Sequence, residues 1–262
     1  MIYHILTNKG SREINEDYAG VGELDGAFCA VLADGLGGHG RGEVASELAV
    51  KISLSLWENF AGNTEGFLEK CFRKSQEKLL KKQEEENAKG EMKTTMTLLV
   101  SDGRKVQWGH IGDSRLYCFF DNKIVARTLD HSVPQMLVAS GEIKEKDIRG
   151  HEDRNRLLRV MGAPWDSPRY ELAKPVGYEK RFSFLLCSDG FWELIEDKEM
   201  VSCLKKSATP KEWLEEMEKI VLKNGSGKNM DNYTAIGVFL GDEKEKDEGG
   251  SFFKKLFKGK TL

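Results

Sequence analysis

Residues 27–35 read Ala-Phe-Cys-Ala-Val-Leu-Ala-Asp-Gly, an apolar run that stops at an acidic residue followed by glycine. A short apolar run bounded by such a turn signal predicts a buried strand. The carboxylate of Asp34 would then lie at the edge or mouth of a sheet, partly dry and still within reach of solvent. Gly35 lets the backbone approach closely, so its carbonyl can join a set of ligands.

Apolar runs elsewhere in the chain predict further strands, some of them paired as hairpins. Asp102-Gly103 and Asp121-Asn122 separate neighbouring runs, and such dipeptides favour tight turns. The expected strands cover residues 96–101, 105–108, 115–120, 123–126, 182–187 and 233–240. Apolar residues recur with a helical period in residues 45–56, 68–79 and 210–221. Because helices and strands are grouped and do not strictly alternate, we predict an α+β fold with helices outside antiparallel sheets.

Composition excludes several functional classes. The 262 residues suit one large domain, and a net charge of -3 lacks the basic excess that is typical of nucleic-acid-binding proteins. The 5 cysteines stand singly, which argues against a zinc site or a disulfide framework and favours free thiols in a reducing cytosol. The N-terminus has no signal-peptide pattern, and no apolar run is long enough to span a membrane. We therefore expect a cytoplasmic protein without nucleic-acid partners.

Two segments differ from the strand-rich parts of the chain. Residues 132–162 are polar and have a sequence pattern that favours helix, and we expect them to form an inserted lobe. From Gly241 the chain becomes a charged linker, followed by a tail in residues 251–262 where phenylalanine and leucine are mixed with lysine. This tail could lie on an anionic membrane or dock weakly on a partner protein. The alternative is a disordered, solubilising tail.

Four turns that carry acidic residues lie at strand ends or at breaks between strand and loop. Clustered carboxylates repel one another, and hard divalent ions such as Mg²⁺ or Mn²⁺ relieve that repulsion. A single Asp-Gly is most often a plain turn, and the spacing alone leaves both a plain turn and a metal site open. The turns are Asn15-Glu16-Asp17, Asp34-Gly35, Ser188-Asp189-Gly190 and Asp231-Asn232.

Arg12 precedes the first of these turns and suggests what the cations would act on. A guanidinium suits bidentate binding of phosphate oxygens, so an arginine beside a carboxylate site indicates phosphoryl chemistry. The alternative is an ordinary surface arginine. Cys187 is interpreted as a buried strand residue, because a cysteine phosphatase needs a phosphate-cradling loop directly after its nucleophile.

Seven segments, taken in order, resemble the motifs of the type 2C metal-dependent (PPM) serine/threonine protein phosphatase family, and the Gly-Gly-His at 37–39 resembles its bacterial branch. The resemblance implies a four-layer α-β-β-α sandwich of two antiparallel sheets flanked by helices, with residues 132–162 as a flap. It makes residues 1–241 the catalytic domain and leaves 242–262 as linker and tail. The segments are residues 12–17, 33–46, 111–115, 129–132, 155–162, 187–190 and 231–234.

The same resemblance implies a site for two Mn²⁺ or Mg²⁺ ions. Asp34 would bridge the ions, and the carbonyl of Gly35 would bind one of them. Asp189 and Asp231 would complete the protein ligands. Arg12 would clamp the phosphate of the substrate, so that Arg12 and Asp34 are the expected catalytic residues.

Three further acidic residues have implied roles at the edge of this site. Glu16 or Asp17 would reach water bound to the metals. Asp113 resembles the residue that, with help from the Asp189 loop, holds a third and weaker cation in bacterial members. The general acid stays open, because Leu36 stands where eukaryotic members carry a histidine and the nearest histidine is His39.

The implied function is hydrolysis of phosphoserine and phosphothreonine in proteins by a water that two metals activate. The enzyme would oppose a Ser/Thr kinase in bacterial signalling, and we expect it to be a monomer. One alternative is a catalytically weak regulatory or scaffold module that binds phosphoproteins without turnover. Another is a specialised phosphatase that acts on one regulatory protein within a signalling or secretion system.

Overall fold

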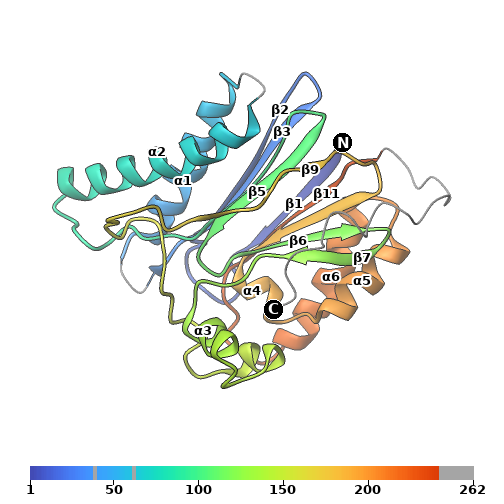
Figure 1. Cartoon of the computed structure of the whole chain (residues 1–262). Coiled ribbons are helices and arrows are strands. Elements are labelled where there is room, and N and C mark those ends of the chain that lie inside the picture. The colour runs from blue at the N-terminus through green and yellow to red at the C-terminus, as the bar shows by residue number, and fades with distance from the viewer. Residues whose placement is uncertain (38–39, 61–62, 242–262) are drawn as a thin grey trace.

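The computed structural model describes residues 1–37, 40–60 and 63–241. Two antiparallel sheets pack face to face, and a pair of helices covers the outer face of each sheet (Figure 1). One apolar cluster lies between the two sheets. Each sheet also has one apolar cluster between its outer face and its helices. The predicted four-layer α-β-β-α sandwich is therefore confirmed.

The first sheet joins the two ends of the described chain. Strand β1 pairs with β11 along its whole length, from Ile2 opposite Phe239 to Asn8 opposite Tyr233. This register places the loop after β1 beside the loop before β11. In spatial order the sheet consists of β1 (Ile2–Asn8), β11 (Tyr233–Phe239), β10 (Phe182–Cys187), β6 (Arg115–Phe120) and β7 (Lys123–Arg127).

The second sheet contains the strand from which the sequence analysis began. In β3, Cys29 and Val31 face the helices, whereas Phe28 and Ala30 face the other sheet. Both faces are covered, which explains why this strand reads as a continuous apolar run instead of an alternating one. The sheet consists of β2 (Asp17–Leu24), β3 (Ala27–Asp34), β4 (Met96–Ser101), β5 (Lys105–Ile111) and β8 (Glu171–Leu172), with β9 (Val176–Gly177) also paired to β5.

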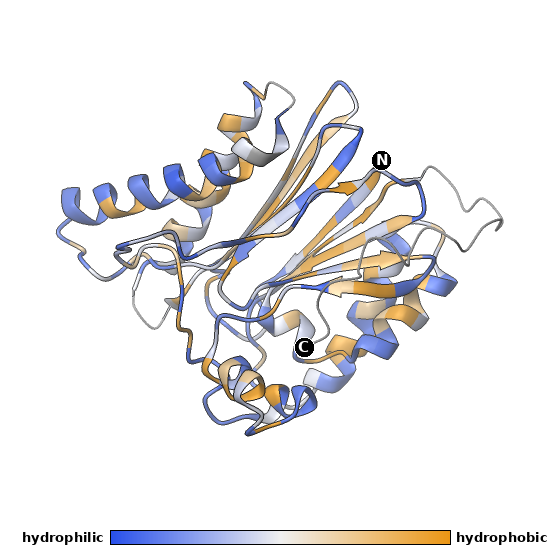
Figure 2. Cartoon of the chain, viewed as in Figure 1, coloured by the Kyte–Doolittle hydropathy of each residue, from blue (hydrophilic) through white to orange (hydrophobic). Residues whose placement is uncertain are grey.

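Amphipathic helices form the two outer layers. Figure 2 shows apolar residues gathered on the strands and on the inner sides of the helices, with hydrophilic residues outside. Helix α6 starts with Pro210, and the Thr209 hydroxyl caps it by accepting from the amide of Glu212 at 3.2 Å. The outer helices are α1 (Gly42–Trp57) and α2 (Thr64–Glu85) on the second sheet, and α5 (Asp197–Lys206) and α6 (Pro210–Gly225) on the first.

The segment predicted to be a flap, residues 132–162, contains α3 (Val133–Ser140) and the 3-10 helix η2 (Glu145–Gly150). Buried Ile148 anchors η2 in the apolar cluster beside the first sheet. The division into a catalytic domain, a flap and a tail stays a prediction, and residues 242–262 lie outside the described part of the chain. Among the described residues, no helix is both long and apolar enough to cross a membrane.

Of the longer elements, β1, β2 and α5 escaped the sequence analysis, as did the short β8, β9 and α4 (Asp189–Trp192). Strand β2 carries Gly20 and Gly22, which have low strand propensity. A Cβ at Gly22 would lie 2.5 Å from Cδ1 of Trp57, so glycine lets α1 approach the sheet closely. Strand β1 is a half-exposed edge strand, and α5 buries only Met200, Cys203 and Leu204. These weak apolar patterns become clear only once the neighbouring layers are known.

Candidate active site

The four acidic turns meet at one end of the sandwich, although they are far apart in the chain. Asp17, the first residue of β2, lies directly opposite Asp34, the last residue of β3. Asp189 begins the short helix α4 (Asp189–Trp192) after β10, and Asp231 precedes β11. Asp113, in the turn after β5, is close enough for its charge to act on Asp34 together with the other three aspartates. The sequence-predicted aspartates therefore form one cluster.

Asp17 is held in place through one of its two carboxylate oxygens. The Ser188 hydroxyl donates to Oδ2 of Asp17 at 2.7 Å and accepts from the amide of Thr234 at 2.9 Å. Oδ1 of Asp17 is buried and has no hydrogen-bond partner. A buried carboxylate oxygen without a donor is costly unless a cation or water satisfies it. This orphaned oxygen fits a site that takes metal ions.

The backbone at Gly35 leaves no room for a side chain. A Cβ there would lie 2.4 Å from the carbonyl carbon and oxygen of Gly42 and 2.7 Å from the carbonyl oxygen of Glu16. The amide of Gly35 donates to that same Glu16 carbonyl at 3.1 Å. Only glycine allows the turn after β3 to pass so close to two other backbone segments.

Asp17, Asp34, Asp113 and Asp189 resist ionisation. Burial raises the pKa of Asp34 well above its usual value, and the negative charges of its aspartate neighbours raise it further. Burial and neighbouring charge also raise the pKa of Asp17 to about 7 and that of Asp189 to about 6. For Asp113 the pKa rises well above its usual value from the same causes. Divalent cations remove this repulsion, and carboxylate and carbonyl oxygens are the ligands that Mg²⁺ and Mn²⁺ prefer.

Arg12 lies at the mouth of the cluster and is half-exposed. Its Nη2 donates to Oδ2 of Asp231 at 2.8 Å, so it contacts one of the predicted metal ligands directly. Asn232 holds the loop that carries Arg12: its side-chain amide donates to the carbonyls of Lys9 and Ile14, both at 2.9 Å. The Asn232 side-chain oxygen accepts from the amide of Glu16 at 2.9 Å. Sequence reasoning gave no role to Asn232.

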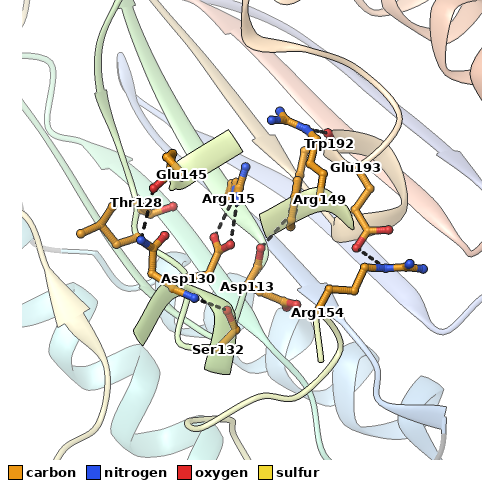
Figure 3. A network of polar contacts seen from close by, with 12 residues as sticks. Asp113, Arg115, Thr128, Asp130, Ser132, Glu145, Arg149, Arg154, Trp192 and Glu193 are labelled. Atoms are coloured by element: carbon orange, nitrogen blue, oxygen red, sulfur yellow. Dashed lines mark hydrogen bonds and ion pairs between the residues drawn. The ribbon is translucent and has the colours of Figure 1, made fainter. Parts of the chain in front are cut away.

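A buried ion pair supports the Asp113 side of the cluster (Figure 3). Arg115 binds Asp130 through two hydrogen bonds of 2.8 and 2.7 Å, and both side chains are 1% exposed. Above the Arg115 guanidinium lies the ring of Trp192, with its centroid 3.4 Å from Cζ. The indole N–H of Trp192 donates to the backbone carbonyl of Asp113 at 3.0 Å.

Glu193 is a further acidic residue that sequence reasoning missed. It follows Asp189 by four residues, so one helical turn brings the two carboxylates onto the same face, and that spacing was readable in the sequence. Burial and the charge of Asp189 raise the pKa of Glu193 to about 8, and Arg154 opposes this through an ion pair of 2.8 Å.

A second cluster with metal-binding residue types has a different geometry. The rings of His110 and His131 stack with centroids 4.5 Å apart and planes 15° from parallel, and Glu171 lies 3.3 Å from Nε2 of His131. A cation binds in the plane of an imidazole, and two stacked planes cannot share it. Nδ1 of His131 also accepts from the amide of Gly112 at 3.2 Å, and Nε2 of His110 bonds to the carbonyl of Leu129 at 2.7 Å. These histidines each hydrogen-bond to the backbone of a nearby loop.

Two other residues of the sequence analysis can be placed. Cys187 is fully buried in β10, and burial raises the pKa of its thiol, which makes it a poor nucleophile. This agrees with its interpretation as a strand residue. His39, one candidate for the general acid, lies outside the described residues.

Raised carboxyl pKa values predict an unusual dependence of stability on pH. The folded protein holds protons on Asp17, Asp189 and Glu193 up to about pH 6 to 8, whereas in the unfolded chain these groups ionise near pH 4. Their contribution to the free energy of unfolding is therefore present at low pH and is lost as the pH rises from about 4 to 8. With Mn²⁺ the loss should shrink, because the cation binds the ionised form more tightly as pH rises.

Thermal unfolding at about pH 5.5 and pH 7.5, with EDTA and with MnCl2, measures this contribution. Asp189→Asn removes one of the three groups and should flatten the pH dependence in EDTA. A protein in EDTA that is equally stable at both pH values, with no change in Asp189→Asn, would contradict the prediction.

Comparison with known proteins identifies the family. Residues 8–232 match the model of the protein phosphatase 2C family. The serine/threonine phosphatase stp of Listeria monocytogenes serotype 4b (strain F2365) is 30% identical over 239 residues, which cover 88% of this chain and 93% of that protein.

Solved structures agree with this match. The serine/threonine phosphatase Stp1 from Staphylococcus aureus superposes with a TM-score of 0.80 at 28% identity, covering 91% of this chain and 95% of that one. The catalytic domain of the serine/threonine protein phosphatase PstP in complex with 2 manganese ions gives a TM-score of 0.74 at 27% identity, covering 90% and 96%. The resemblance found in the sequence motifs is confirmed: the chain belongs to the protein phosphatase 2C family of metal-dependent serine/threonine phosphatases.

Proposed function

We propose that the aspartate cluster is the active site and that it holds two divalent cations, Mn²⁺ or Mg²⁺, during hydrolysis of phosphoserine and phosphothreonine in proteins. The observation that carries the proposal is the orphaned, buried Oδ1 of Asp17 within a group of carboxylates that repel one another. Asp34, Asp189, Asp231 and the carbonyl of Gly35 would hold the cations. Asp113, with help from the Asp189 turn, would hold a third cation.

Bound cations would supply a water of lowered pKa and stabilise the charge that builds up on the phosphoryl group. The chain's own residues would do the positioning. Asp17 and Glu16 would accept hydrogen bonds from water beside the cations, and Ser188 would fix the orientation of Asp17. Arg12, at the mouth of the site, would bind two phosphate oxygens and leave its contact with Asp231 when substrate arrives.

The biological setting belongs to the same proposal. Phosphorylated proteins would be the substrates, and a Ser/Thr kinase would be the counterpart that makes them. The protein would act in the cytoplasm as a monomer, and residues 242–262 would contact a partner or an anionic membrane only weakly. A module that binds phosphoproteins without turnover is not favoured, because the relatives named above are phosphatases.

The test is hydrolysis of p-nitrophenyl phosphate and of a phosphothreonine peptide with Mn²⁺, with Mg²⁺ and with EDTA. We expect turnover that depends on the metal and stops in EDTA. A folded protein that binds the phosphopeptide but turns over neither substrate with any divalent metal would exclude the proposal and favour the binding module.

Arg12→Ala is expected to lower kcat/KM for the phosphopeptide about 100-fold, since the variant loses charged donors aimed at the phosphate. Arg12→Lys should recover only part of this loss, because lysine offers a point charge where arginine offers a planar fork. Arg73→Ala, which removes an exposed arginine from α2, is the matched control and should behave as wild type. Equal kinetics of Arg12→Ala and wild type would remove Arg12 from the substrate site.

A further inference from the structure

The flap is docked on the segment that follows Asp189, and Arg149 makes three hydrogen bonds there. From η2, Arg149 donates to the backbone carbonyls of Trp192 at 3.2 Å and Ile195 at 3.1 Å, and to the carboxylate of Asp197 at 3.0 Å. Its side chain is 18% exposed, so the guanidinium is largely shielded from water, whereas the Asp197 side chain is 43% exposed. Hydrogen bonds from a charged donor to partly buried acceptors are the stronger kind.

Trp192 connects this docking contact to the acidic cluster (Figure 3). The guanidinium of Arg115 lies 3.4 Å from the Trp192 ring centroid, and that of Arg149 lies 5.7 Å from it. Both distances are within the range of cation–π attraction. The indole N–H meanwhile donates to the carbonyl of Asp113. One side chain thus contacts the sheet, the flap and the turn that carries a predicted metal ligand.

The two arginines that contact Trp192 differ in freedom. Arg115 is 1% exposed and is bound by Asp130 through two hydrogen bonds, so it forms a fixed base. Arg149 belongs to the inserted segment, and its hydrogen bonds join that segment to residues in and after α4. Arg154 adds a second contact between the same two parts, its ion pair with Glu193. A shift of the flap would therefore change the contacts of the Trp192 side chain mainly through Arg149.

We propose that Arg149 and Trp192 are positioning residues of the active site: Arg149 fixes the flap on Trp192, and Trp192 fixes the turn of Asp113 relative to Asp189. The inference rests on the proposed function, since it takes these aspartates to be cation ligands. Coupling between two sites is reciprocal. Cation binding at the Asp113–Asp189 end should hold the flap down, and a docked flap should tighten cation binding there.

Hydrogen–deuterium exchange of the full chain tests this coupling without requiring turnover. In wild type, saturating Mn²⁺ should slow amide exchange in residues 141–160 by about fivefold or more. Arg149→Lys keeps the positive charge but loses the fork of donors, and Trp192→Phe keeps an aromatic ring but loses the N–H to Asp113. In either variant the effect of Mn²⁺ on the flap should fall below about twofold.

Titration calorimetry measures the dissociation constant of the weakest Mn²⁺ site, and this constant should rise in both variants. The factor by which it rises should equal the factor by which the Mn²⁺ effect on flap exchange falls. Arg156→Ala is the matched control, because Arg156 belongs to the same segment but is 71% exposed and lies 3.8 Å from its partner Asp153. It should keep both the exchange effect and the affinity. Arg149 is partly exposed, so Arg149→Lys should fold even where Trp192→Phe is too unstable to measure.

Two failures are distinguishable. A wild type whose Mn²⁺-dependent turnover is normal, but whose flap exchange does not respond to Mn²⁺, overturns the inference and leaves the proposed function intact. The inference is overturned in the same way if Arg149→Lys responds to Mn²⁺ as strongly as wild type. Absence of metal-dependent turnover in wild type would remove the proposed function instead.

Discussion

Asp34→Asn is expected to lower kcat at least about 1,000-fold with either Mn²⁺ or Mg²⁺, for p-nitrophenyl phosphate and phosphothreonine peptide alike. Cations that stabilise the charge of a transferring phosphoryl group are worth several kcal/mol, and each 1.4 kcal/mol is about tenfold in rate. Asn has nearly the shape of Asp but lacks the charge. Its effect would therefore come from lost cation binding, and initial rates over a range of metal concentrations measure it.

Stability distinguishes this loss from misfolding. Asp34 is a buried acid whose pKa is raised by burial and by its aspartate neighbours, so the neutral Asn should leave the metal-free protein as stable as wild type or more stable. Asp102→Asn is the control, because the Asp102 side-chain oxygen accepts from the amides of Arg104 and Lys105 and asparagine can do the same. An Asp34→Asn enzyme with more than about a tenth of wild-type kcat would mean that Asp34 is not an essential ligand.

Asp130→Ala should lower the free energy of unfolding by about 3–5 kcal/mol. The substitution leaves the guanidinium of Arg115 buried without its counter-ion, and the Tyr117 hydroxyl at 3.2 Å and the Trp192 ring cannot replace a carboxylate. Urea denaturation of both proteins in EDTA measures the difference. A change of less than about 1 kcal/mol would show that water reaches Arg115 or that its surroundings rearrange.

The exposed pair of Lys74 and Glu77 on α2 gives the matched control. Their charged groups lie 2.7 Å apart, which is as close as the buried pair, but both side chains are about half-exposed. Glu77→Ala should lower the free energy of unfolding far less than Asp130→Ala does, since solvent screens exposed ion pairs. The two variants together separate the effect of burial from that of distance.

Local patterns in the sequence predicted an α+β fold with helices outside antiparallel sheets, and they also marked the separate acidic turns. An apolar run that ends in Asp34-Gly35 places a carboxylate at the end of a buried strand whatever the rest of the fold does. The hairpin at Asp102-Gly103 likewise follows from two short runs and a turn dipeptide. Relating the turns at Asp189 and Asp231 to Asp34 needed the order of motifs along the whole chain, because spacing alone left a plain turn open as the alternative.

The parts that sequence missed depend on contacts between distant segments. Arg149, in a polar stretch of charged residues, has no local feature that marks it as the partner of Trp192. Ser188 reads as part of a turn, and its bond to Asp17 appears only when the end of β10 in the first sheet meets the start of β2 in the second. Gly22 reads as a strand breaker, and its use as a gap for Trp57 requires α1 to be in place.

The pairing of β1 with β11 has a consequence for synthesis of the protein on the ribosome. Arg12 follows the first strand and Asp231 precedes the last, so their contact forms only when these two strands are joined. A nascent chain that still lacks β11 has already made Asp17, Asp34 and Asp113 but cannot complete the cluster. Translation itself therefore delays assembly of the site until the last strand has emerged, and a truncated product ending before residue 231 would lack it permanently.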